Sequence, residues 1–179
     1  MHYLHCILVS VETPKGQLAA EKLDELKRAA KETALDETEE FGEGLVFDWR
    51  ADGPGRWAEK VPDVILGAEN PEEFLEVLRE WSEKPFKQAV WFYDTYIQPK
   101  FPQGLVINKQ FLADAWEEKM EMPLLWALDD IVPILQGDYT SASHFYSVPD
   151  RSCKLSSETL KKVRKHPEKY ALVFFDIHN

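Results

Sequence analysis

Cysteine is scarce in this chain, whose 179 residues include only Cys6 and Cys153. A disulfide framework or a zinc site needs cysteines in pairs or at close spacing, so neither is predicted. Cys6 lies within an apolar run, where a thiol packs as a small buried hydrophobic group. No basic N-terminal segment precedes a long apolar run, and no stretch approaches membrane-spanning length. We therefore expect no membrane partner and a location in the reducing cytoplasm.

Basic residues are few relative to acidic ones. Lys and Arg number 21 against 32 Asp and Glu, which gives a net charge of −11. This balance argues against nucleic acid as a partner, because phosphate contacts require clustered Lys and Arg. Nine acids and four bases lie between Glu21 and Glu43, a pattern typical of a solvated helix face. An acidic helix of this kind also fits an alternative function, that of an inhibitor that binds a host protein.

Recognisable catalytic motifs are lacking as well. The sequence contains no nucleophile elbow, no zinc-protease helix motif, no phosphate-binding loop and no dinucleotide fingerprint. No catalytic residue, metal ligand or cofactor is therefore predicted. One dispersed alternative is a hydrolase or metal enzyme in which His2 or His5 meets Asp176 and His178 where the terminal strands pair. His2 and His5 have opposite strand parity, so only one of them can share a given face.

The hydrophobic pattern predicts a single α+β domain over residues 1–179. Residues 3–11 and 170–178 are continuously apolar, which indicates two buried strands at the centre of a mixed or antiparallel sheet. Helices are expected to pack on that sheet. The clearest one begins at Asn70, which can cap it, and carries apolar residues at helical spacing as far as Trp81. Asn108 and Ser156 are expected to cap two further helices.

Other segments are predicted from local composition. Thr13-Pro14 suggests the start of a helix with Leu26 and Ala34 on its inner face. The remaining expectations are a buried strand ending over 45–48, an edge strand or loop over 61–67, and strands over 88–97, 105–107 and 139–148. Residues 122–135 are apolar but contain two prolines, and they are left unassigned.

A turn rich in glycine, tryptophan and arginine follows residue 48 and is the candidate binding site. Arginine forks bind carboxylate or phosphate, indole faces stack on bases, and glycines let backbone N–H groups approach an anion. The alternative is a purely structural turn, with the indoles in the core and the arginines paired with neighbouring acids. The predicted ligand-binding residues are Asp48, Trp49, Arg50, Gly53, Gly55, Arg56 and Trp57.

The same turn resembles a family of small uncharacterised phage and prophage proteins. Those proteins carry an Asp-Trp-Tyr-x-x-Gly-Gly-Arg-Trp stretch and end in a hydrophobic strand that closes with Asp-x-His. Asp48-Trp49, the run 55–57 and the run 176–178 match this pattern. Arg50 replaces the family's Tyr, and Pro54 lengthens the loop. The resemblance implies a viral origin and no particular reaction.

The leading hypothesis is a non-catalytic, phage-encoded binding protein. It would capture an anionic, nucleotide-like small ligand and thereby antagonise a host defence signal, with the viral setting resting on the resemblance alone. Six tryptophans and ten phenylalanines are enough to leave an apolar patch through which the chain forms homo-oligomers.

Overall fold

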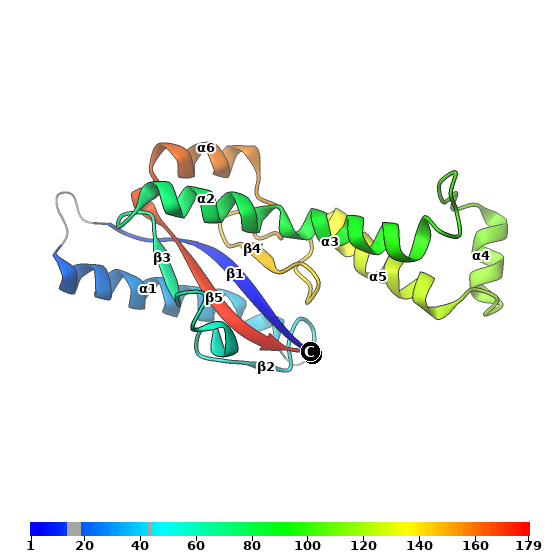
Figure 1. Cartoon of the computed structure of the whole chain (residues 1–179), viewed down its shortest axis with the longest axis horizontal. Coiled ribbons are helices and arrows are strands. Elements are labelled where there is room, and N and C mark those ends of the chain that lie inside the picture. The colour runs from blue at the N-terminus through cyan, green and yellow to red at the C-terminus, as the bar shows by residue number, and fades with distance from the viewer. Residues whose placement is uncertain (14–18, 43) are drawn as a thin grey trace.

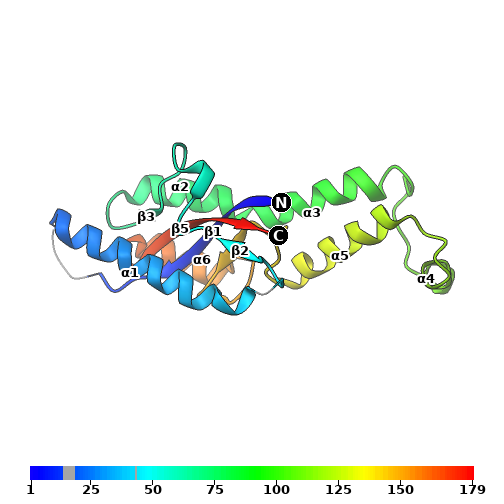
Figure 2. The same cartoon turned by 90° about the horizontal axis from the view of Figure 1, so that it is seen from below.

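Two strands from opposite ends of the chain form the centre of the sheet. The computed structural model describes residues 1–13, 19–42 and 44–179. Strand β1 (His2–Ser10) pairs antiparallel with β5 (Tyr170–His178) along its whole length. The two termini consequently lie side by side (Figure 2). Both strands are buried on both faces, which explains why neither shows polar alternation, and the predicted central pair is confirmed.

Three short strands complete a mixed sheet. Strand β4 (Phe145–Ser147) runs parallel to the free edge of β1. On the other side, β2 (Trp49–Arg50) and β3 (Val64–Leu66) pair antiparallel with different parts of β5. The strand order is β2-β5-β1-β4, with β3 also against β5. The sheet and the helices that cover it confirm the predicted α+β class. For residues 61–67, where either an edge strand or a loop was expected, the structure has the strand β3.

Helices cover both faces of the sheet (Figure 1). They are α1 (Ala20–Thr38) on one face, and α2 (Pro71–Ser82) with α6 (Ser157–Lys165) on the other. Successive strand side chains point to opposite faces. Ile7 therefore joins the core cluster that contains Ala30 of α1, whereas Leu8 joins the one that contains Phe74 of α2. This alternation decides which polar side chains at the strand ends can meet.

A helical arm extends from one end of the sheet (Figures 1 and 2). It comprises α3 (Lys84–Phe92), the π-helix η3 (Tyr93–Ile97), α4 (Lys109–Trp116) and α5 (Met122–Gln136). Helices α3 and α5 run antiparallel and share a small core of their own that includes Ala89, Leu124 and Ile131. None of the described helices is both long and apolar enough to cross a membrane.

Three of the predicted helix caps are confirmed, those of α2, α4 and α6. The side-chain oxygen of Asn70 accepts the backbone N–H of Glu73, and Pro71 occupies the first turn of α2. Asn108 and Ser156 accept backbone N–H groups in the same way at α4 and α6. The short polar side chain replaces the hydrogen-bond partner that the first turn of a helix lacks.

Several strand predictions were wrong. Residues 88–97 form the end of α3 and the π-helix, because Ala89 and Ile97 bury one helical face against α5 and packing overrides β propensity. Residues 105–107 form no strand. Only Phe145–Ser147 of the run 139–148 is a strand, and the unassigned run 122–135 is helix α5.

The two segments that flank α1 also differ from expectation. Pro14 lies outside the described residues, and α1 begins at Ala20, so Thr13 does not cap it. The Thr13 hydroxyl instead donates to the carbonyl of Glu168. Residues 45–48 form turns and no strand, although Val46 and Phe47 are buried. The strand in this region is β2, which starts one residue later.

Candidate functional site

The structure disperses the seven residues of the predicted turn site. Trp49 lies opposite His178 and Arg50 lies opposite Ile177, so the two neighbours point to opposite faces of the sheet. Arg56 and Trp57 belong to the short 3-10 helix η2 (Gly55–Trp57), which packs against β5. The expectation that one bend presents both guanidinium groups and both indoles together was wrong, because the residues alternate across a strand before the turn begins.

Arg50 stabilises the face covered by α1. Its guanidinium donates to the hydroxyl oxygen of Thr38 at 2.6 Å and lies over the rings of Phe47 and Phe175, at 5.0 and 5.1 Å from their centres. Burial lowers the pKa of Arg50, and no carboxylate of the described residues forms an ion pair with it. Cation–π contacts of this kind hold a charge within an apolar layer. Arg50 therefore fixes β2 to the core on the face covered by α1, opposite to the face of Trp49.

Gly53 and Gly55 bring the turn close to Asp176 of β5. The carbonyl of Gly53 accepts the backbone N–H of Asp176, and a Cβ at Gly55 would lie 2.5 Å from the Asp176 carboxylate. The backbone N–H of Arg56 donates to that carboxylate at 3.4 Å, and its Nε is 3.5 Å away. The glycines thus serve contact with a buried acid of the chain itself. Asp52, in turn, pairs with Lys31 at 2.9 Å.

Two histidine–carboxylate pairs lie side by side where β1 and β2 begin and β5 ends. Nδ1 of His2 is 2.9 Å from the Asp176 carboxylate, which is 4% exposed, and Nδ1 of His178 is 2.8 Å from that of Asp48. The hydrogen bond from His178 lowers the pKa of Asp48. The two imidazole rings are 4.9 Å apart. His2, Asp48, Trp49 and His178 line an open, shallow hollow of about 440 Å³, which we call the histidine hollow.

Strand parity separates His5 from this group, as expected. His5 is buried on the α1 face, where Nδ1 is 2.6 Å from the Tyr139 hydroxyl and Nε2 donates to the carbonyl of Ser141 at 3.1 Å. Burial, with a smaller effect of the nearby His144, holds the pKa of His5 well below its ordinary value. His5 is therefore a neutral, fully hydrogen-bonded core residue. Among the described residues, no group of three His, Cys, Asp or Glu side chains is arranged to hold a metal ion.

A second concave surface adjoins the histidine hollow and is richer in aromatic side chains. We call it the tryptophan groove, and its volume is about 510 Å³. Indoles from three separate elements line it, namely Trp57 of η2, Trp81 of α2 and Trp91 of α3. The other lining residues are His2, Tyr3, Leu4, Lys84, Lys87, Gln88 and His144. His2 borders both hollows and so connects them.

The charges around the tryptophan groove favour an anion. Lys84 and Lys87 line it, and no carboxylate of the described residues does, although the whole chain carries a net charge of −11. The Lys84 ammonium lies 4.7 Å from the centre of the Trp81 ring, and Lys87 pairs with the exposed Glu83 at 2.8 Å outside the lining. Arg56 lies over the Trp57 ring at 5.7 Å, but its charge is already paired with the Asp176 carboxylate.

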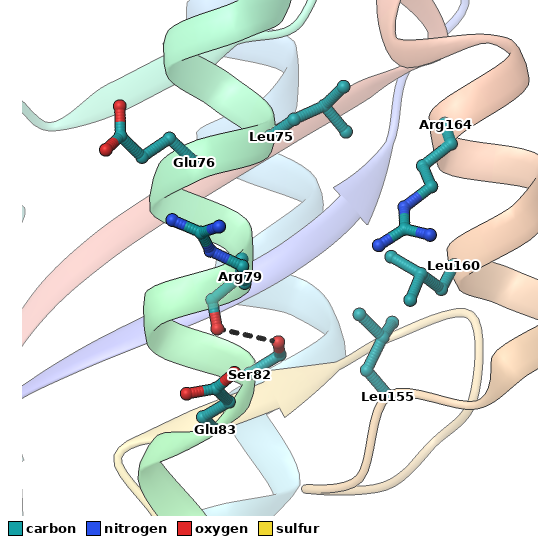
Figure 3. Close-up of a pocket in the computed structure, with 8 residues that line it drawn as sticks. All are labelled: Leu75, Glu76, Arg79, Ser82, Glu83, Leu155, Leu160 and Arg164. Atoms are coloured by element: carbon teal, nitrogen blue, oxygen red, sulfur yellow. Dashed lines mark hydrogen bonds between the residues drawn. The ribbon is translucent and has the colours of Figure 1, made fainter.

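Another cavity lies between α2 and α6 and has a volume of about 670 Å³. Figure 3 shows Leu75 of α2 directed toward Leu155 and Leu160, with Arg164 extending from α6 toward α2. Two arginines and two glutamates border it, so their charges cancel. No aromatic side chain of the described residues lines it, and we regard it as an imperfectly filled helix–helix contact.

The residues of the tryptophan groove carry a periodic signal that the sequence interpretation missed. Trp81, Lys84, Gln88 and Trp91 follow one another at intervals of three, four and three residues, which places them on one helical face. Interpreting 88–97 as a strand concealed this pattern. Comparison of the chain with protein-family models, curated proteins and solved structures finds no match.

Proposed function

We propose that the chain is a binding protein whose tryptophan groove captures a planar, anionic small molecule of the nucleotide type. The observation that carries this proposal is the convergence of three indoles and two lysines on one groove, which no carboxylate lines in the part of the chain that the structure describes. Indole faces stack on nucleobases, and ammonium groups attract phosphates. We keep the ligand class predicted from the sequence but assign it to a different site. The tryptophan groove has only Trp57 in common with the predicted turn site at 48–57.

The groove suits a small ligand better than a nucleic acid strand. A volume of about 510 Å³ is that of an ordinary small-molecule site. A strand would need a continuous basic track along the surface, and a chain with 32 acids and 21 bases would repel its backbone beyond the groove. If the chain is phage-encoded, as the family resemblance implies, sequestering a host nucleotide signal would counter host defence.

Isothermal titration calorimetry against a panel of mononucleotides, cyclic nucleotides and dinucleotides tests the proposal. At least one member should bind saturably, and Trp91→Ala should weaken it by at least about fivefold, since stacking on an aromatic side chain contributes about 1–3 kcal/mol per base. Lys87→Glu should weaken the same ligand more at low than at high salt. Trp91 is 50% exposed, so its removal should leave the fold intact.

Trp116→Ala is the matched control, because Trp116 is 88% exposed and lies on α4, outside the groove. It should bind the ligand as the unaltered chain does. The proposal fails if no member of the panel binds. It also fails if Trp116→Ala loses as much affinity as Trp91→Ala.

Acid–base catalysis on the bound ligand is a second candidate function. The Asp176 carboxylate engages Nδ1 of His2, which leaves Nε2 for other partners, and His2 borders the groove. On a phosphate ester, Nε2 would take a proton from a water molecule while the oxygen of that water attacks phosphorus. The bond from phosphorus to the leaving oxygen would break, and that oxygen would take the proton back.

Product analysis by chromatography of any nucleotide that binds distinguishes the two functions. Turnover that is lost in His2→Gln and kept in His166→Gln, a change at an exposed histidine outside both hollows, would support catalysis. Binding without turnover leaves the chain a capture protein and removes the second candidate.

A further inference from the structure

The tryptophan groove and the histidine hollow lie on the same face of the sheet. His2 stands directly opposite His178 in the β1–β5 pair, and Trp49 stands opposite the same histidine in the β2–β5 pair. Side chains directly opposite each other on antiparallel strands point to the same face. Leu4, two residues along β1 from His2, shares this face and lines the groove. The two hollows are therefore neighbouring parts of one surface, and His2 borders both of them.

Each hollow presents a half-exposed indole. Trp49 of the histidine hollow is 49% exposed, and Trp91 of the tryptophan groove is 50% exposed. The ring centre of Trp49 is 5.6 Å from that of His2, so a ligand that extends from Trp49 into the groove crosses a single imidazole ring. Because nucleobases stack on aromatic side chains one after another along a strand, two such platforms suit two linked bases.

The two hollows differ in charge. Lys84 and Lys87 line the tryptophan groove, whereas the carboxylate of Asp48 lines the histidine hollow, where it pairs with His178 at 2.8 Å. A carboxylate repels phosphate but accepts hydrogen bonds from amino and hydroxyl groups. A ligand that occupies both hollows therefore directs its phosphate toward the lysines and an uncharged base with its sugar toward Trp49.

We propose that the ligand is a dinucleotide, which spans both hollows. This inference rests on the proposed function and narrows it to two bases joined through phosphate. One base stacks on the indoles of the tryptophan groove, and the other stacks on Trp49. The linking phosphate crosses His2, whose Nδ1 is engaged by Asp176, so that Nε2 is the ring nitrogen available to it. Once one base is bound, the linker holds the second at a high effective concentration beside its own platform.

Isothermal titration calorimetry of the full chain tests the dinucleotide. Each common mononucleotide is compared with the linear and the cyclic dinucleotide of the same base. At least one dinucleotide should bind about fivefold more tightly than its mononucleotide, or tighter still, because fivefold is the smallest effect expected from stacking one further base. Trp49→Ala should weaken that dinucleotide by the same factor and leave the mononucleotide unchanged. Trp91→Ala should weaken both ligands.

Trp126→Ala is the matched control for Trp49→Ala. Trp126 is 58% exposed, close to the 49% of Trp49, and it lies on α5, outside the lining of both hollows. Both ligands should bind this variant as they bind the unaltered chain. Mononucleotide binding by Trp49→Ala shows that this variant is folded, and the comparison of ligands on the unaltered chain requires no substitution.

Three results would overturn the inference and leave the proposed function standing. The first is that every dinucleotide binds within about fivefold of its mononucleotide. The second is that Trp49→Ala weakens both ligands equally or neither of them. The third is that Trp126→Ala weakens the dinucleotide as much as Trp49→Ala does. A panel in which no ligand binds at all instead removes the proposed function, and the dinucleotide with it.

Discussion

Replacement of Gly55 by alanine should damage the junction between the turn and β5. Gly55 has a φ of +52°, in the left-handed region that side chains with a Cβ rarely adopt. A Cβ at this position would lie 2.5 Å from Oδ2 and 2.6 Å from Cβ of Asp176. Asp176 cannot move away easily, because it is paired in the central strand and its carboxylate contacts His2.

The expected loss has two parts. The left-handed conformation costs a residue with a Cβ about 1–2 kcal/mol, and overpacking against a fixed neighbour costs a further ~1–3 kcal/mol, so Gly55→Ala should lower the free energy of unfolding by about 2–5 kcal/mol. Gly44→Ala measures the first part alone, so the difference between the two variants gives the second. The φ of Gly44 is +84°, but nothing lies within 4 Å of a Cβ built there. Gly44→Ala should therefore lose only the backbone cost of about 1–2 kcal/mol.

Urea unfolding followed by circular dichroism measures both variants against the unaltered chain. An unchanged slope with urea would show that the compactness of the two states is preserved and that the midpoints can be compared. If Gly55→Ala proves no more destabilising than Gly44→Ala, the close packing of the turn on Asp176 is refuted. Because Trp57 follows Gly55 in the same short helix, Gly55→Ala should also weaken any ligand bound in the tryptophan groove.

Three further predictions concern a cap and two titrating groups. Asn70→Ala removes the oxygen that accepts the first-turn backbone N–H of α2, and it should cost about 1 kcal/mol in urea unfolding. Asn70→Asp keeps that oxygen, so equal losses in both variants would contradict the capping role. Because burial holds the pKa of His5 well below its ordinary value, the unfolded chain binds the extra proton first as pH falls below about 6.5. The free energy of unfolding should therefore decrease, as the pH is lowered, by at most about 1.4 kcal/mol per pH unit for this residue. An NMR titration in which the His5 imidazole of the folded chain protonates near pH 6.5 would refute this prediction. Burial and the neighbouring Asp129 raise the pKa of Asp130, so the folded state holds that proton more tightly and loses stability as pH rises through the range just above the ordinary carboxyl value. Asp130→Asn should therefore raise the urea midpoint at pH 7 and change it little near pH 3, and an equal or lower midpoint at pH 7 would refute the prediction.

Local signals in the sequence determined much of the framework. The two terminal strands were predictable because a strand buried on both faces must be apolar at every position, as 3–11 and 170–178 nearly are. The capped helices after Asn70, Asn108 and Ser156 were predictable because a cap depends on residues only three positions apart. Strand parity likewise separated His5 from His2 before their partners were known.

Tertiary structure decided the site. The run 88–97 has the composition of a strand, and only its packing against α5 makes it a helix that places Trp91 beside Trp81. Trp57 reaches the same groove because two glycines let the turn close on Asp176. Arg50 points away from it because one residue along a strand reverses the face. Composition shows which side chains are able to bind an anion, but the meeting of three elements distant in sequence depends on long-range packing that no local pattern encodes.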